Sequence, residues 1–222
     1  MSFLRFTLLY TCLLTLMLAG WETARSQPLR MYFTRLEAGP SWMNFEALNE
    51  ALTARQFLAL PQSITAAGLT HTRLRDNWML GLSMYNFAFS KSLANNQSAI
   101  MGYHYALVRG GYAFRLNEQL ILYPGIGAGG GLGALRVRAA SQQTPVPYRT
   151  AGPLVDLSIN VSNVSPIPDG SDYGFEIGCS AGYLTHLSQG WQIEGFRTDS
   201  QFIPVSPQGF YVRVSMGLAR YR

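Results

Sequence analysis

Ser180, His186 and Glu176 supply the side-chain types of a hydrolase within one short segment: a nucleophile, a base and a carboxylate. Their even spacing places all three on one face of an extended strand. At about 3.3 Å per residue, however, Ser180 and His186 would be roughly 20 Å apart. A serine is activated only by a base within hydrogen-bond reach. The segment therefore does not predict a catalytic pair, no other group of residues predicts one better, and we expect a protein that is not an enzyme.

The glycine-rich run at residues 125–131 is a second candidate for chemistry, because glycine-rich loops can hold phosphates. A phosphate-binding loop of the Walker type continues with Lys and then Ser or Thr, and neither follows this run. Glycines that alternate with Ile126, Ala128 and Leu132 instead suit the inner face of a narrow barrel. No residues have the spacing of metal ligands, so we expect neither a metal nor a cofactor.

Six charged side chains fall on the polar face of segments whose other face is apolar. They are Arg35, Glu37, Arg109, Asp156, Glu176 and Arg213. The same assignment is extended to His71, Arg73 and His104. In a narrow interior such charges must be paired and hydrogen-bonded, because burying an isolated charge is costly. We expect a stabilising network of ion pairs in which Glu176 faces Arg213; a path for protons or ions is the alternative.

The elements that would position these charges are β-strands. In the last segment the apolar residues occupy every second position, a period of two that gives a strand one apolar and one polar face. They are Phe210, Val212, Val214, Met216 and Leu218. Eight such strands can be drawn, at residues 29–39, 62–74, 77–90, 98–114, 119–138, 150–161, 172–187 and 208–221. No segment after the N-terminus is apolar over the 18 or so residues that a spanning helix needs.

The connections between these strands alternate in length. Short turns are expected at residues 75–77, 115–118 and 165–170, and longer loops at 40–61, 91–97, 139–149 and 188–207. Outer-membrane barrels have short turns on the periplasmic side and an even number of strands, so both termini would face the periplasm. Aromatic residues near the strand ends suggest interfacial girdles. They include Trp78, Phe87, Phe89, Tyr112, Phe114, Tyr123 and Tyr221.

The N-terminus has the pattern of an export signal. Arg5 precedes an apolar run at residues 6–18, and small residues before Gln27 predict cleavage there. We expect a signal peptide at residues 1–26 and one barrel domain at 27–222. Removing two arginines and one glutamate lowers the net charge from +5 to +4, without any basic run, so a nucleic-acid partner is not expected. Cys179 then remains alone, which excludes an internal disulfide.

One helix is predicted, at residues 44–60, in the first long loop. Asn44 can cap it and Pro61 ends it. Phe45, Leu48 and Leu52 recur at helical spacing. The apolar face that they form would either close the rim of the barrel as a lid or dock a partner.

This combination of export signal, alternating strands and tight turns resembles the small outer-membrane β-barrel proteins of the OmpA/OmpX type, and the outer membrane beta-barrel domain proteins of Bacteroidota. The C-terminal assembly signal of that family has alternating apolar residues and an aromatic residue at the end. The alternation is matched by Val212, Val214, Met216 and Leu218, whereas the aromatic Tyr221 is the penultimate residue. The resemblance implies an eight-stranded antiparallel barrel in the cell outer membrane, surrounded by lipid and lipopolysaccharide.

The resemblance also implies a role in envelope integrity, adhesion or complex assembly, with other outer-membrane or periplasmic proteins as partners. A narrow conduit for small solutes is the main alternative, and a lipid-modifying enzyme is a further one. A soluble, lipocalin-like binder of apolar ligands would need an apolar interior, which the Arg, Glu and Asp residues argue against.

Overall fold

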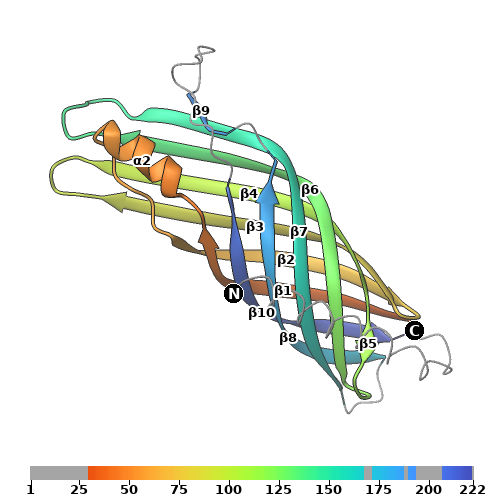
Figure 1. Cartoon of the computed structure of the whole chain (residues 1–222). Helices are drawn as coiled ribbons and strands as arrows, with labels where there is room; N and C mark the ends of the chain where they lie inside the picture. Colours follow the sequence, from red (N-terminus) through yellow and green to blue (C-terminus); the bar gives the residue numbers. More distant parts are fainter. Residues whose placement is uncertain (1–29, 168–171, 188–189, 194–206, 222) are drawn as a thin grey trace, which may run out of the picture.

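The structure is a computed structural model that describes residues 30–167, 172–187, 190–193 and 207–221. The described chain forms eight long antiparallel strands and one short helix (Figure 1). The long strands are β1 (Arg30–Met43), β2 (Ser63–Arg75), β3 (Trp78–Ser92), β4 (Ser98–Tyr112), β6 (Leu120–Arg138), β7 (Val146–Pro166), β8 (Tyr173–His186) and β10 (Gln208–Tyr221). The helix is α2 (Glu46–Ala54), and two short pairings add β5 (Phe114–Arg115) and β9 (Gln192–Ile193). No helix in the described part of the chain is long and apolar enough to cross a membrane.

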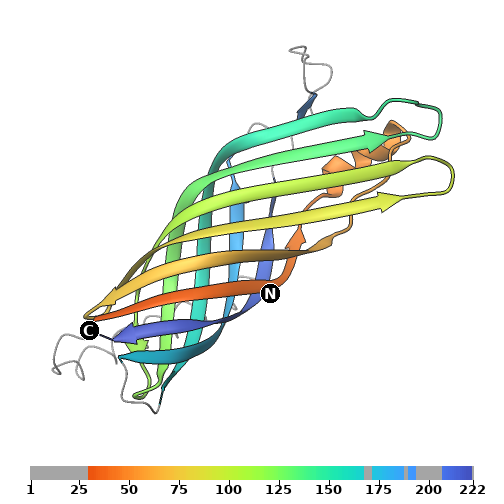
Figure 2. The ribbon, with the colours of Figure 1, turned by 180° about the vertical axis from the view of Figure 1, so that it is seen from behind.

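The sheet closes on itself. Each long strand pairs with its neighbour in sequence, and β1 also pairs with β10, as Figure 2 shows from behind. Closure removes the unpaired strand edges, so each long strand has a hydrogen-bonded neighbour on both sides. The predicted all-β, eight-stranded antiparallel barrel is therefore confirmed.

The two ends of the barrel differ. One end, which we call the turn end, holds the start of β1, the end of β10 and the tight turn at residues 76–77, where Asp76 has a positive φ of 57°. The opposite end, the loop end, holds α2 and the longer connections. This alternation agrees with the predicted one, although the signal peptide and parts of two connections lie outside the described residues.

Three elements, β1, β7 and α2, differ in length from the prediction. β1 continues to Met43 even though Pro40 has no N–H, because its pairing with β10 omits residues 39 and 40 and resumes at Ser41. β7 extends at both ends, where it pairs with β6 and β8. The helix is shorter than predicted and ends at Ala54, and the left-handed Gln56 follows at a φ of 62°.

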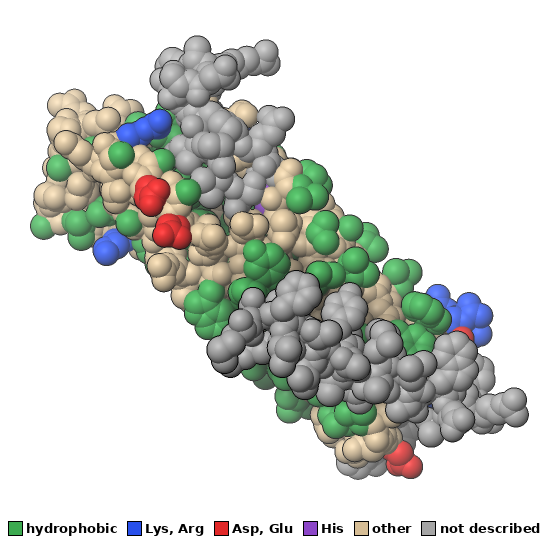
Figure 3. Space-filling view, in the orientation of Figure 1, with side chains coloured by type: hydrophobic (Ala, Val, Ile, Leu, Met, Phe, Trp, Pro, Cys, Tyr) green, Lys and Arg blue, Asp and Glu red, His purple; other side chains and the backbone are tan. Residues whose placement is uncertain are grey.

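The outer face of the barrel is strongly apolar. Val214, Phe210, Met84 and Trp78 each expose 66% of their surface, and Figure 3 shows apolar side chains along the length of the barrel. On β10 the outward apolar positions run from Phe210 to Leu218, close to the 9–11 residues that a tilted strand needs to cross a bilayer. Cys179 is also exposed on this face.

The interior forms three layers. An apolar cluster fills the turn end, a second, larger one fills the loop end, and charged and hydroxyl-bearing side chains lie between them. The turn-end cluster contains Met31, Phe33, Leu74, Met79, Ala113, Ile121, Tyr123, Val164 and Ala219. The expectation of a polar interior therefore holds only for the middle layer, because the inward residues near both ends of the strands are apolar.

We predict that Val214→Arg impairs assembly or stability by about 2–4 kcal/mol if the barrel spans a bilayer, because it places a charge on the apolar outer face near mid-height. Ser90→Arg is the matched control: Ser90 faces outward near the loop end, in register with Ile100, which in turn pairs with Arg136. The heat-induced gel-mobility shift and unfolding in detergent measure both. Equal losses in the two variants would contradict the assignment of this apolar belt to the membrane.

Candidate functional site

The six charged residues predicted to face the interior all do so. Glu176 and Asp156 are 0% exposed, and Arg109, the most accessible of the six, is 8% exposed. The other three, Arg35, Glu37 and Arg213, expose 1–3% of their surface. With all six ionised, three arginines balance three carboxylates, so the middle layer carries no net charge.

The part of this network nearer the turn end is centred on Arg35. Its guanidinium lies 3.0 Å from Glu37 Oε1 and 3.3 Å from Glu176 Oε1, and it also donates to the hydroxyl of Tyr123. Ser162 donates to the same Glu176 oxygen at 2.7 Å. Arg35 therefore holds two carboxylates from β1 and β8 together, and each bond is charge-assisted.

Tyr85 joins this part of the network to the part nearer the loop end. Its hydroxyl donates to Glu37 Oε2 at 2.6 Å and accepts from Arg109 at 3.0 Å. Arg109 in turn pairs with Asp156 at 2.8 Å, and Tyr211 donates to the other oxygen of Asp156 at 2.8 Å. A continuous set of polar contacts therefore crosses the barrel from β8 to β7 through β1, β3 and β4.

The charge of Arg213 is stabilised by tyrosine side chains and not by a carboxylate. Its guanidinium carbon lies 3.9 Å from the ring centroid of Tyr85 and 3.8 Å from that of Tyr211, and it donates to the hydroxyl of Tyr105. Aromatic faces attract a cation most strongly where water is excluded. The six residues thus divide into two groups of ion pairs and one arginine held by rings.

The predicted contact between Glu176 and Arg213 is wrong. Arg213 is in register with Ser180, four residues along β8 from Glu176, which corresponds to about 13 Å. Glu176 instead pairs with Arg35, since β1 reaches it across the interior. β8 and β10 are hydrogen-bonded to each other, but their register does not place Glu176 opposite Arg213.

The sequence pattern did not predict the tyrosines that take part in this network, which are Tyr85, Tyr105, Tyr123 and Tyr211. Tyr105 and Tyr211 lie at even spacing from Arg109 and Arg213, so alternation alone could have placed them inside. Two aromatics assigned to interfacial girdles, Phe87 and Tyr123, are buried in the interior. Trp78 and Tyr112 do lie on the outside, in edge-to-face contact at 5.4 Å.

The prediction that the interior also contains His71, Arg73 and His104 is wrong, because all three side chains face outward. His104 has the opposite parity to Arg109 on the same strand, so the two cannot share a face. On β2 the inward positions are Thr70, Thr72 and Leu74. Because β2 and β4 carry apolar residues on both faces, alternation does not indicate which face is the inner one.

The glycines of β6 make room for this interior, as expected. A Cβ on Gly127 would lie 3.1 Å from Arg109 Cγ and 3.3 Å from Asp156 Cβ. On Gly131 it would lie 2.4 Å from the hydroxyl oxygen of Tyr103. Larger residues at these positions would collide with side chains that reach across from other strands.

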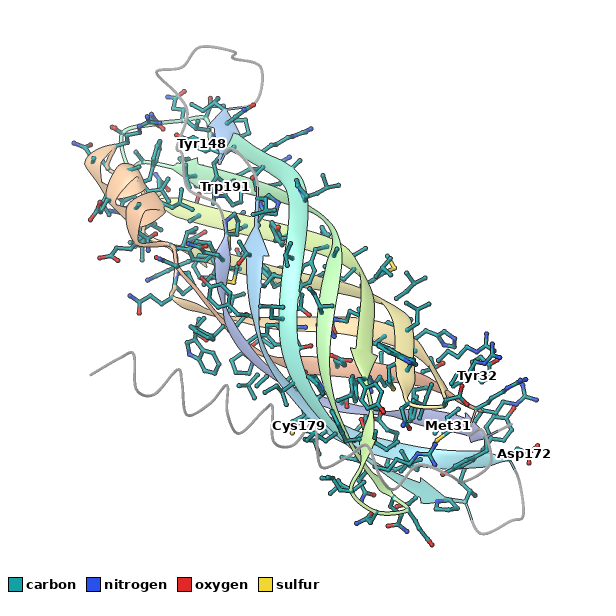
Figure 4. All side chains as sticks on the ribbon, turned by 45° about the vertical axis from the view of Figure 1, so that its right-hand side comes forward. Met31, Tyr32, Tyr148, Asp172, Cys179 and Trp191 are labelled. Carbon is teal, nitrogen blue, oxygen red and sulfur yellow. The ribbon has the colours of Figure 1, made fainter. Side chains whose placement is uncertain are left out.

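The helix closes the loop end. Leu48 and Leu52 are 0% exposed and Phe45 is 1% exposed, and all three belong to the apolar cluster of the barrel interior. Figure 4 shows Tyr148 and Trp191 at the same end as α2, while Met31 and Tyr32 lie at the opposite end. The lid interpretation is therefore the one the structure supports, and docking of a partner through these three residues is contradicted by their burial.

The residues with hydrolase chemistry do not form a site. Ser180 and His186 both face inward, and His186 packs edge-on against Tyr103 with the ring centroids 5.8 Å apart. Within the described part of the chain, the hydroxyl of Ser180 has no hydrogen-bond partner. Among the described residues, no group of His, Cys, Asp and Glu could hold a metal ion.

We predict that Arg35→Met and Glu176→Gln are energetically coupled. Arg35→Met leaves the buried carboxylate of Glu176 without its cation, and Glu176→Gln leaves Arg35 with Glu37 alone, each at a cost of up to about 3–5 kcal/mol. The double variant should be milder than the sum by roughly 1–3 kcal/mol. Arg35 also faces Glu37, so the coupling will not cancel the whole loss. Denaturant unfolding of the detergent-solubilised barrel measures each corner of the cycle.

The matched control is the cycle of Glu176→Gln with Arg213→Met, which should be additive within about 0.5 kcal/mol because the two groups do not touch. A coupling of Glu176 to Arg213 as large as that to Arg35 would contradict the arrangement described above.

The fold is that of small outer-membrane β-barrels. The attachment invasion locus protein Ail of Yersinia pestis, solved alone and with the heparin analogue sucrose octasulfate, superposes with a TM-score of 0.50 at 13% identity, over 86% of this chain and 99% of Ail. Neisserial surface protein A gives a TM-score of 0.44 at 10% identity, over 86% of this chain and 96% of that one. The outer membrane protease OmpT of Escherichia coli gives 0.39 at 10% identity, over 90% and 98%. No protein-family model matches the chain, and no curated protein matches it in sequence.

Proposed function

We propose that the chain is an integral outer-membrane barrel with a structural or interaction role and without catalytic activity. The observation that carries this proposal is the filled interior: apolar side chains occupy both ends and a charge-balanced network occupies the middle. Such an interior stabilises the barrel, and its inward positions are occupied by the barrel's own side chains. The finer resemblance, to the barrel proteins of Bacteroidota, stays a prediction.

The same observation argues against the conduit alternative. A charged path needs water or mobile protons, and here each end of the polar layer is covered by buried apolar side chains, with α2 over the loop end. An eight-stranded barrel is only wide enough for its own side chains. The role in the membrane therefore belongs to the outer surface and the loop end.

The loop end offers the surface for a protein partner. β3, β4, β6 and β7 are among the longest strands and extend past the apolar belt at this end. Glu46 and Glu50 lie on the exposed side of α2, opposite its buried leucines. Partners in the outer membrane or at the cell surface would meet these polar side chains, whereas the belt below them would contact lipid and lipopolysaccharide.

Membrane fractionation tests the location. The protein should stay with the outer-membrane pellet through alkaline carbonate and high salt, and should require detergent for extraction, because the exposed apolar belt exceeds what a soluble monomer tolerates. Recovery of a monodisperse protein from the periplasm without detergent would overturn the proposal.

Single-channel recording on the same detergent extract tests the role. Reconstituted into planar bilayers, the folded barrel should give no conductance steps above baseline, with a porin as the positive control. Phe57→Ala, whose side chain belongs to the apolar cluster under the lid, should stay equally silent, because the middle layer remains in place. Reproducible steps from the wild-type protein would favour the conduit alternative.

A further inference from the structure

Four arginines gather on the outer surface at the turn end, and we call them the arginine patch. Arg30 on β1 is in register with Arg75 on β2, while Arg73 on β2 and Arg220 on β10 are both in register with Tyr32. All four arginines are exposed. Figure 3 shows basic side chains gathered at the end where Figure 1 places the C-terminus. Four cations therefore lie side by side on three adjacent strands.

The positive charge of the patch is not neutralised within the described part of the chain. No ion pair joins any of the four arginines to a described residue, although Asp76 and Asp172 lie at the same end. Instead, Arg73 lies over the ring of Tyr32 at 5.5 Å and Arg220 over the ring of Tyr173 at 5.6 Å. Aromatic rings orient these guanidiniums without cancelling their charge, so they remain available to an external anion.

The residues between the patch and the apolar belt are also ordered by polarity. Next to the arginines, Thr34 and His71 form a hydrogen bond at 2.9 Å on the outer face. One row further from the rim lie Leu36 and Leu69, which are 62% and 49% exposed. From rim to belt the surface thus offers guanidinium, then hydroxyl and imidazole, then hydrocarbon. A phospholipid presents its phosphate, ester and acyl groups in the same order.

We propose that the arginine patch binds the phosphate of an anionic phospholipid in the periplasmic leaflet. This inference rests on the proposed function, since it requires the turn end to lie at that leaflet. A zwitterionic headgroup carries its own ammonium beside the phosphate, so an uncompensated cluster of guanidiniums favours lipids whose headgroup has no cation. Each arginine close to an anionic lipid surface raises the affinity by about fivefold.

The experiment titrates the folded barrel in neutral detergent micelles with phosphatidylglycerol or phosphatidylcholine of the same acyl chains, and detects bound lipid by native mass spectrometry. Phosphatidylglycerol should bind more tightly than phosphatidylcholine. Arg73→Gln with Arg220→Gln should weaken that binding by roughly 25-fold, the product of two contributions of about fivefold each. Lys91→Gln with Arg138→Gln removes the same charge at the loop end and should leave the binding unchanged.

Two results would overturn the proposed lipid site. Equal binding of phosphatidylglycerol by the wild type and by the Arg73→Gln, Arg220→Gln variant would overturn the inference, as would competition by millimolar inorganic phosphate, which would indicate a free-anion site. If the double variant does not fold, the single variants Arg73→Gln and Arg220→Gln should each lose about fivefold. A protein that never partitions into micelles contradicts the proposed function instead, so the two failures are distinguishable.

Discussion

Buried charge is the constraint on which the rest of this structure depends. An isolated ion in a water-free interior costs far more than the few kcal/mol by which proteins are stable. Here three arginines and three carboxylates occupy one layer of a narrow barrel, and Tyr85 links their two groups of ion pairs. Because each carboxylate has an arginine or a tyrosine hydroxyl within hydrogen-bond distance, the layer is stable only as a complete set.

The layers on either side follow from that requirement. The network gains strength where water is excluded, because electrostatic interactions weaken in a polar solvent. Apolar side chains cover it at the turn end, and Phe45, Leu48 and Leu52 of the lid help to cover it at the loop end. Glycines on β6 permit the approach of Arg109 and Tyr103. The helix is thus part of the barrel core, which explains why its apolar face is buried.

The fold could be predicted because alternation is unambiguous on the strands that matter most. On β10 and β8 most apolar residues share one parity, so alternation assigned Val214 and Ile177 to the outer face and Arg213 and Glu176 to the interior. β2 and β4 carry apolar residues on both faces, and there the assignment of His71, Arg73 and His104 went wrong. The partner of Glu176 could not be predicted, because Arg35 reaches it across the barrel while the sequence gives only neighbouring strands.

Thiol accessibility tests the central claim, a filled and water-excluded interior, most directly. In a Cys179→Ala background, Ser158→Cys places a thiol in the middle layer, beside Asn160, and Ser90→Cys places one on the outer surface near the loop end. A small charged thiol reagent should modify Cys at position 90 within minutes and leave Cys at position 158 unmodified until the barrel is denatured. Rapid modification at position 158 in the folded protein would show that water and ions enter the interior, and would contradict the account.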